Sequence, residues 1–208
     1  MVKARSKLRE RIREATAEAI LDAAETVFAA EGVRTARVER IAQVAGVSVG
    51  TLYNHFDDRE AVLCALIRAR KAGVNEALDA QLAQADRPFR EQLSGVLQAL
   101  FDNYESHRPF FSVLLQGEVD RGAARARAKT SSTRGAMLEI RKRLQVLVDR
   151  GIEAGEVDPG LAKLAPTLLL GAARAVIVRA FFEGDLDARA STGELVRFFL
   201  HGAGRRHG

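Results

Sequence analysis

The chain has 208 residues and a single cysteine, and 47% of its residues are hydrophobic. A chain of this size and composition suits a globular protein with a small head and one larger helical body. One cysteine excludes an internal disulfide framework, and the charged N-terminus lacks the apolar core of a signal peptide. We therefore expect a cytoplasmic protein.

Residues 1–13 form a basic arm in which only Glu10 is acidic. The formal net charge of the whole chain is +5. Such an arm favours contact with the phosphates of a nucleic acid, and N-terminal arms of this kind reach into minor grooves. A disordered solubilising tail is the alternative interpretation. The basic residues of the arm are Lys3, Arg5, Lys7, Arg9, Arg11 and Arg13.

The stretch after the arm has the period of one amphipathic helix, with an apolar stripe at Ile20, Ala24, Val27 and Phe28. Acidic residues recur at helical spacing away from that stripe, and we expect them to form a solvated face. These acidic residues are Glu14, Glu18, Asp22 and Glu25.

Residues 38–56, VERIAQVAGVSVGTLYNHF, predict two short helices bent around Gly46. A glycine there can adopt the left-handed conformation of a sharp turn, and Ser48 is placed to accept hydrogen bonds from the first amides of the second helix. The apolar stripe of the first helix follows the i, i+3, i+4, i+7 spacing. It comprises Val38, Ile41, Ala42 and Ala45.

The second of these helices buries Leu52 and Phe56, which are one turn apart, and so presents Gly50 and Asn54 on its opposite side. Gly50 lets a backbone approach closely, and the amide of Asn54 can pair with a base edge. The flanking residues Thr51 and Tyr53 add hydroxyl groups that can reach phosphates or bases. The pattern predicts a helix-turn-helix that binds DNA in the major groove. An ordinary helical hairpin inside a core is the alternative.

The stretch VERIAQVAGVSVGTLYNHFDDREAVL, preceded by AILDAAETVFAAEGV, resembles the N-terminal domain of the TetR family of transcriptional regulators. The AAExxFAxxG and IAxxAGVSxGTLYxHF patterns occur in the family's order and at its spacing. The resemblance implies a three-helix DNA-binding head, a larger all-helical ligand-binding body and a homodimer that represses transcription until a small molecule binds. The body carries no motif of the family that we can identify.

The chain departs from the family pattern at the start of each helix of the motif. The family usually has Thr or Ser directly before the first helix, whereas this chain has Ala36 and Arg37, with Thr35 one residue early. Thr35 can still cap the helix or touch a phosphate, and the alternative is that Arg34 or Arg37 replaces that contact. Val49 stands where the family often has a basic residue, so we expect one DNA contact to be lost.

Arg59 matches a basic residue that the family places near the start of the fourth helix, where it resembles a phosphate clamp. The predicted DNA contacts combine this position with the loop before the motif and with the outward face of the second helix. They are Arg34, Thr35, Arg37, Ser48, Val49, Gly50, Thr51, Tyr53, Asn54, His55 and Arg59.

The body is predicted to be helical throughout. A long helix is expected over residues 58–85, starting from a capping-box-like pair, Asp57 and Glu60. Pro88 is expected to begin another helix and Pro109 a short apolar one, and residues 137–152 have a clear helical period. Residues 121–129 fit either a loop or a helix. The basic side chains of residues 120–150 indicate a solvated helix face, with a second DNA site as the alternative.

Residues 161–183 are hydrophobic nearly all the way round, so a soluble helix there must be covered on both sides. Pro166, Arg174 and Arg179 argue against a membrane span. Ser191 and Glu194 resemble a capping box that starts a final helix. We expect these two helices to form a dimer interface, with completion of a monomeric core as the alternative. The interface candidates are Ala172, Ala175, Val176, Arg179, Phe182, Leu195, Phe198 and Phe199.

An apolar body with few polar groups suggests a hydrophobic or amphipathic effector. The effector-binding candidates are Leu66, Arg70, Leu100, Tyr104, His107, Phe111, Met137, Ile140 and Arg174. An enzyme is the alternative class, supported by His107 beside Arg108 with Asp102, Asn103, Tyr104 and Glu118 near in sequence. No nucleophile and base arrangement, phosphate loop or zinc spacing is visible, so we expect no catalysis, no metal and no cofactor.

The apolar periods and capping residues along the chain predict an all-α fold of about nine helices. The expected parts are the basic arm at residues 1–13, a helix-turn-helix domain at 14–57 and an effector-binding and dimerisation domain at 58–208. The expected function is that of a homodimeric repressor, released from a palindromic operator by a small effector. A DNA-binding regulator that needs no ligand is the alternative.

Overall fold

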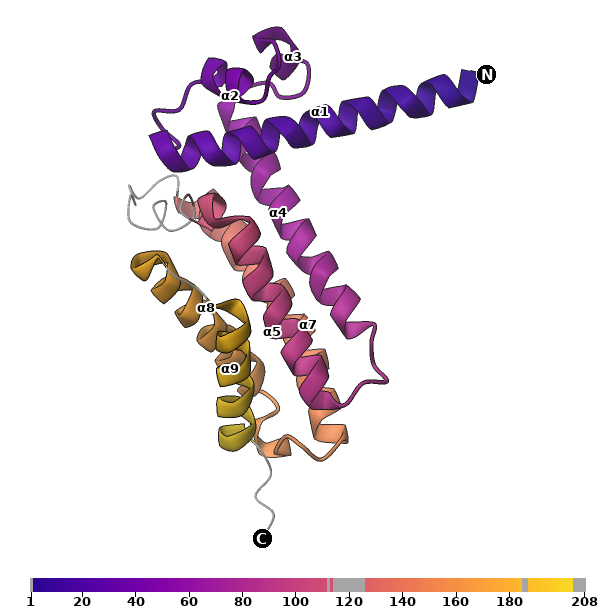
Figure 1. The fold of residues 1–208 in the computed structure, drawn as a ribbon, viewed down its shortest axis with the longest axis vertical. Coiled ribbons are helices and arrows are strands. Elements are labelled where there is room, and N and C mark those ends of the chain that lie inside the picture. The colour runs from indigo at the N-terminus through magenta and orange to yellow at the C-terminus, as the bar shows by residue number, and fades with distance from the viewer. Residues whose placement is uncertain (1, 112, 114–125, 185–186, 204–208) are drawn as a thin grey trace. The chain divides into compact units, whose positions relative to one another are not determined.

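The computed structural model describes residues 2–111, 113, 126–184 and 187–203, and helices are the regular elements found among them (Figure 1). The all-α class expected from the sequence is therefore confirmed. In chain order the helices are α1 (Val2–Glu31), α2 (Val38–Val44), α3 (Val49–Tyr53), α4 (Arg59–Leu82), α5 (Phe89–Ser106), α7 (Ala126–Glu153), the 3-10 turn η1 (Pro159–Leu161), α8 (Ala165–Glu183) and α9 (Ala188–Ala203).

The chain divides into two compact units, and the division falls within α4. The first unit, called the head here, comprises Met1–Arg70 and Pro109–Asp120. The second unit, called the body, comprises Lys71–Arg108 and Arg121–Gly208. The first half of α4 and the segment after Pro109 thus belong with the DNA-binding motif, beyond the boundary at residue 57 that the sequence suggested.

The head is built on α1, whose apolar stripe is buried as predicted. Ile20, Ala24 and Phe28 are fully buried, and they pack with Ile41 of α2 and Leu52 of α3. α1 begins at Val2, so the basic arm is the first part of a continuous helix and not a disordered tail.

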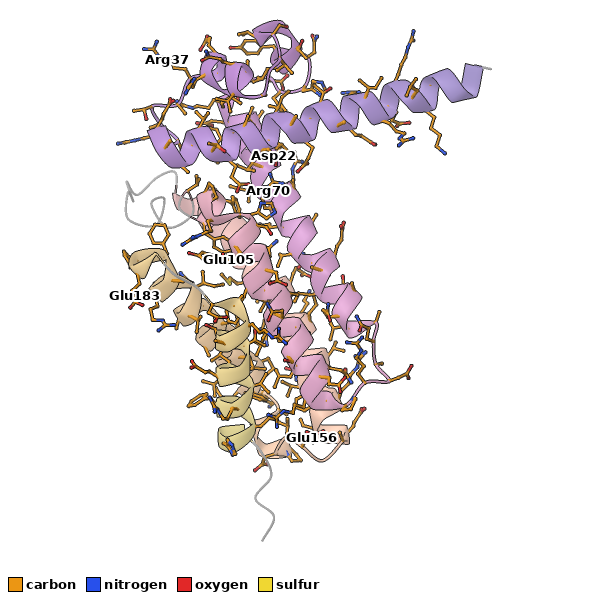
Figure 2. All side chains as sticks on the ribbon, in the orientation of Figure 1. Asp22, Arg37, Arg70, Glu105, Glu156 and Glu183 are labelled. Atoms are coloured by element: carbon orange, nitrogen blue, oxygen red, sulfur yellow. The ribbon has the colours of Figure 1, made fainter. Side chains whose placement is uncertain are left out.

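Most of the acidic stripe of α1 is exposed, as the sequence suggested, but Glu25 is buried and Arg70 of α4 lies against the stripe (Figure 2). Arg70 Nη1 donates to Glu18 at 2.6 Å, Nε donates to Glu25 at 2.7 Å, and Nη2 donates to Asp22. Burial acts to lower the pKa of Arg70, but the hydrogen bonds to Glu18, Glu25 and Asp22 outweigh it and the net shift is upward. The second oxygen of Glu25 accepts the backbone N–H of Phe110 at 3.3 Å.

The N-terminus of α4 is capped by Asp58, whose carboxylate accepts the backbone N–H of Ala61 at 2.7 Å. The predicted cap, Asp57 with Glu60, is therefore wrong by one residue. The predicted span over residues 58–85 is also too long, because α4 ends at Leu82.

The body has its own core, formed by α5, α7, α8, α9 and the second half of α4. Its fully buried side chains include Leu78, Leu97 and Leu147. α5 begins directly after Pro88, as predicted. α7 approaches the start of α5 closely at Gly151, where an added Cβ would lie 2.7 Å from the ring of Phe89.

α8 begins later in the chain than the sequence suggested, and α9 begins earlier. α8 starts at Ala165, and the residues before it include the separate turn η1, which Asp158 caps by accepting the N–H of Gly160 at 2.7 Å. α9 starts at Ala188 and is capped by Asp187, whose carboxylate accepts the N–H of Ala190 at 2.8 Å. Ser191 is buried within the helix, so the predicted capping box with Glu194 is wrong.

α8 buries only one of its two apolar sides within the described residues. Ala165, Leu169 and Ala173 are buried, whereas Leu168 is 54% exposed and Phe182 is 78% exposed. By length and composition alone α8 could cross a membrane, a test that core helices of soluble proteins also pass.

Candidate nucleic-acid interface

α2 and α3 form the corner that the sequence predicted. α2 ends at Val44, and Gly46 has a φ of 69°, in the left-handed region that favours glycine. The N–H of Val47 then bonds to the carbonyl of Ala42 at 3.0 Å, which closes the turn. Ser48 caps α3 by accepting the N–H of Thr51 at 3.0 Å. Local hydrogen bonds therefore fix the angle at which α3 leaves α2.

α3 presents a polar outward face. Leu52 is fully buried beneath it, whereas Gly50 and Asn54 are exposed and Tyr53 is 49% exposed. A Cβ added at Gly50 would meet only the Ser48 hydroxyl, at 3.8 Å, so the protein itself does not require a glycine there. The open position instead leaves room for another molecule to approach the helix backbone.

The loop before α2 supplies exposed basic side chains. Arg34 and Arg37 are both exposed, and Figure 2 shows Arg37 beside α2. Thr35 donates its hydroxyl to the carbonyls of Glu31 and Gly32, so it closes α1 and does not cap α2. Arg37 takes the capping position of α2 without a side-chain hydrogen bond.

Arg59 holds this loop in place. Its Nη1 donates to the carbonyl of Arg34 at 2.6 Å and to that of Ala36 at 3.4 Å. Arg59 is thus a positioning residue in this structure, and its phosphate contact stays a prediction. Val49 and His55 are half-buried, with Val49 packed against the head core and His55 beside the ring of Phe56 at 6.1 Å.

The predicted effector residues divide between the two units. In the head, Leu66 is buried, Phe111 packs against the core, and Arg70 is engaged by the acidic residues of α1. In the body, Leu100 and Tyr104 are buried, His107 ends α5, Met137 and Ile140 are half-buried, and Arg174 is exposed. Their role in binding an effector stays a prediction.

A cavity of about 570 Å³ lies where α4 connects to α5, and none of the predicted effector residues lines it. Its wall includes Arg150, whose Nη1 donates to Gln92 at 2.9 Å and to the carbonyl of Leu82 at 2.8 Å. These bonds tie the connection between the helices together.

The predicted dimer residues lie on α8 and α9, which pack side by side in the body (Figure 1). Phe182 and Phe198 are 78% and 73% exposed, and Ala175 and Arg179 are also exposed. Ala172, Val176 and Leu195 are half-buried. Phe199 is 6% exposed and belongs to the core of its own body, which corrects its assignment to the interface.

The cluster around His107, which supported an enzyme, makes structural contacts. Arg108 donates to the carbonyl of Gly184 at 3.0 Å and lies 5.9 Å from the ring centre of Tyr104. Asp102 accepts a hydrogen bond from Gln98 at 2.8 Å. Glu118 lies outside the described residues.

Comparisons with known proteins point in one direction. Residues 20–66 match the family described as bacterial regulatory proteins, tetR family. The fatty acid metabolism regulator protein of Bacillus subtilis is 27% identical over 153 residues, which cover 73% of this chain and 76% of that protein. The HTH-type transcriptional repressor KstR2 of Mycobacterium tuberculosis is 30% identical over 142 residues, which cover 68% of this chain and 69% of the repressor.

The fold has close counterparts among solved structures. The transcriptional regulator FadR of Bacillus subtilis, solved in complex with stearoyl-CoA, matches with a TM-score of 0.72 at 21% identity. The match covers 89% of this chain and 98% of that one.

Proposed function

The chain belongs to the TetR family of bacterial transcriptional regulators, and from this premise we propose that it is a sequence-specific repressor released from DNA by a small amphipathic effector. The outward face of α3 carries this proposal. Gly50, Tyr53 and Asn54 are exposed directly above the buried Leu52, on a helix held by the Ser48 cap. Such a face offers a close backbone, a hydroxyl and an amide to the edges of base pairs.

Two copies of the chain are proposed to act together. Leu164, Leu168, Phe182 and Phe198 expose large apolar surfaces on or beside α8 and on α9, which a second copy would bury. A two-fold dimer presents two α3 helices to successive major-groove faces, about 34 Å apart in unbent DNA. The operator is therefore proposed to be palindromic, and the protein to work in the cytoplasm, where the DNA is.

The effector is proposed to be an amphipathic molecule, with a long-chain acyl thioester as the first to test. The relatives named for fatty acid regulation, and the structure of one of them with stearoyl-CoA, support this class. An effector that changes the spacing of the two α3 helices, with a coupling of about 1 to 3 kcal/mol, would weaken operator binding roughly 5- to 150-fold.

Selection of bound sequences from random duplexes tests the DNA-binding function directly. Selection with the 208-residue chain should recover a two-fold symmetric motif. Absence of any sequence preference would refute the proposal.

Effector release is tested on the selected duplex by adding stearoyl-CoA, with coenzyme A alone and a detergent of similar chain length as controls. Loss of the complex with stearoyl-CoA alone supports the proposed class. Unchanged affinity at saturating stearoyl-CoA would exclude this thioester and would favour a regulator that responds to another ligand or to none.

A further inference from the structure

The first turns of α1 carry basic side chains that the head does not use. Residues 6–15 are all exposed, and among them are Lys7, Arg9, Arg11 and Arg13. None of these four side chains forms a salt bridge or hydrogen bond with another residue that the structure describes. Their charge is therefore available to a partner.

The helical register places Arg9 and Arg13 on one stripe of α1 with Ile20, Ala24 and Val27. At about 100° per residue, these five positions fall within roughly 60° of one another around the helix. Ile20, Ala24 and Val27 are buried in the head core with residues of α2 and α3. Arg9 and Arg13 thus continue the stripe that packs against the helix-turn-helix.

Lys7 and Arg11 lie on a different stripe. The same register aligns them with Glu18 and Asp22, the residues that pair with Arg70 of α4. The arm therefore has one basic stripe on the side of the helix-turn-helix and another on the side of Arg70.

The stripe of Arg9 and Arg13 runs beyond the helix-turn-helix. Figure 1 shows α2 and α3 on one side of α1, with the N-terminal part of α1 extending past them. Arg9 lies about 16 Å along the axis from Ile20, at 1.5 Å per residue, which corresponds to roughly five base pairs of DNA. A head docked with α3 in a major groove would therefore bring this stripe alongside base pairs outside those that α3 contacts.

We propose that Arg9 and Arg13 bind the phosphates of the duplex outside the base pairs that α3 contacts, and so lengthen the DNA contact of each subunit. This inference rests on the proposed function. The charge of the stripe and its continuity with the α3 side of the head favour duplex DNA as the occupant. An anionic membrane is the competing partner, because Leu8 and Ile12 are exposed between the two basic stripes.

A matched pair of double variants tests the proposal on the duplex recovered by selection. R9Q/R13Q and K7Q/R11Q each remove the same charge, and glutamine retains helix propensity. R9Q/R13Q should reduce the slope of log affinity against log salt by about 1.8 per subunit, since each phosphate contact contributes about 0.9. K7Q/R11Q should change the slope much less.

Trimming the DNA that flanks the selected motif provides a second readout. Shorter flanks should weaken binding of the wild type and of K7Q/R11Q, while R9Q/R13Q should bind long and short duplexes alike. Circular dichroism confirms that both variants remain folded.

Several outcomes would overturn the inference. If R9Q/R13Q and K7Q/R11Q lose the same amount of DNA affinity, only the total charge of the arm affects binding. An unchanged salt slope in R9Q/R13Q would mean that Arg9 and Arg13 contact no phosphate. If R9Q/R13Q no longer binds vesicles of anionic phospholipid but binds DNA as the wild type does, the partner of the arm is a membrane. If the wild type selects a motif and R9Q/R13Q behaves like it, only this inference fails, whereas a wild type that selects nothing removes the proposed function as well.

Discussion

Arg70 of α4 donates from Nε to Oε2 of Glu25 on α1 at 2.7 Å, and each of these side chains is only 6% exposed. Glu25 also accepts the N–H of Phe110, so one buried carboxylate joins α1, α4 and the segment after Pro109 within the head. The remaining nitrogens of Arg70 are satisfied by Glu18 and Asp22. A buried guanidinium whose three nitrogens each donate to a carboxylate holds its helices in one register.

Replacing Arg70 with methionine should destabilise the head strongly. The change keeps much of the side-chain volume but leaves Glu25 buried without its cation, which typically costs about 3 to 5 kcal/mol. Urea unfolding of the purified protein measures the loss. Arg40→Met, which removes a surface ion pair with Glu31, is the control and should cost less than about 1 kcal/mol. Equal losses in the two variants would contradict a special role for the buried pair.

Replacing Asn54 with alanine should weaken operator binding without changing the fold. A side chain that pairs with a base edge contributes about 1 to 3 kcal/mol, so the affinity should fall roughly 5- to 150-fold. Tyr53→Ala should also weaken binding, because its exposed hydroxyl is lost. Titration of the selected duplex measures both effects, and Glu76→Ala, at an exposed position of α4 in the body, serves as the control. Variants that bind as tightly as the control would show that the recognition surface lies elsewhere.

Replacing Phe182 or Phe198 with alanine should weaken the proposed dimer. A fully buried phenylalanine contributes about 1.5 to 3 kcal/mol, and a two-fold interface buries each residue twice. The dissociation constant, measured by sedimentation over a dilution series, should therefore rise by roughly a hundredfold or more. Leu138→Ala, which alters an exposed apolar residue of α7, should leave it unchanged. A wild type that is monomeric at all concentrations would refute the interface.

The pair formed by Asp79 and Arg143 should make stability depend on acid pH. Arg143 donates to both oxygens of Asp79, at 2.8 and 2.7 Å, and these hydrogen bonds lower the pKa of Asp79 from its ordinary value of 3.8. Because the folded pKa lies below the unfolded one, the stabilisation is present above the ordinary pKa and is lost as pH falls through the folded pKa.

Asp79→Asn should therefore be less stable than the wild type at neutral pH, and the difference should vanish at strongly acid pH. Thermal unfolding at a series of pH values measures this difference. In the double variant that also carries Arg143→Gln, this pair should contribute no pH dependence to the stability. A constant gap between wild type and Asp79→Asn across the whole series would rule out the coupling.

The helix-turn-helix could be predicted from the sequence because its determinants are local. The turn at Gly46, the Ser48 cap and the burial of Leu52 depend on residues within a few positions of one another. Helix starts were harder to predict where several capping residues stand together. Asp58 caps α4 instead of Asp57, and Asp187 caps α9 instead of Ser191. Each of these residue types can cap a helix, so the sequence alone does not decide between them.

The sequence by itself determined the all-helical class, the DNA-binding corner and the exposed polar face of α3, since periodic burial and turn chemistry are encoded over short stretches. Only the tertiary structure decided that the acidic stripe of α1 holds Arg70, which lies 45 residues from Glu25 in the chain. It also decided that Phe199 is buried while its neighbour Phe198 is exposed. Both outcomes depend on which helix packs against which face, and that choice is made by contacts between distant segments.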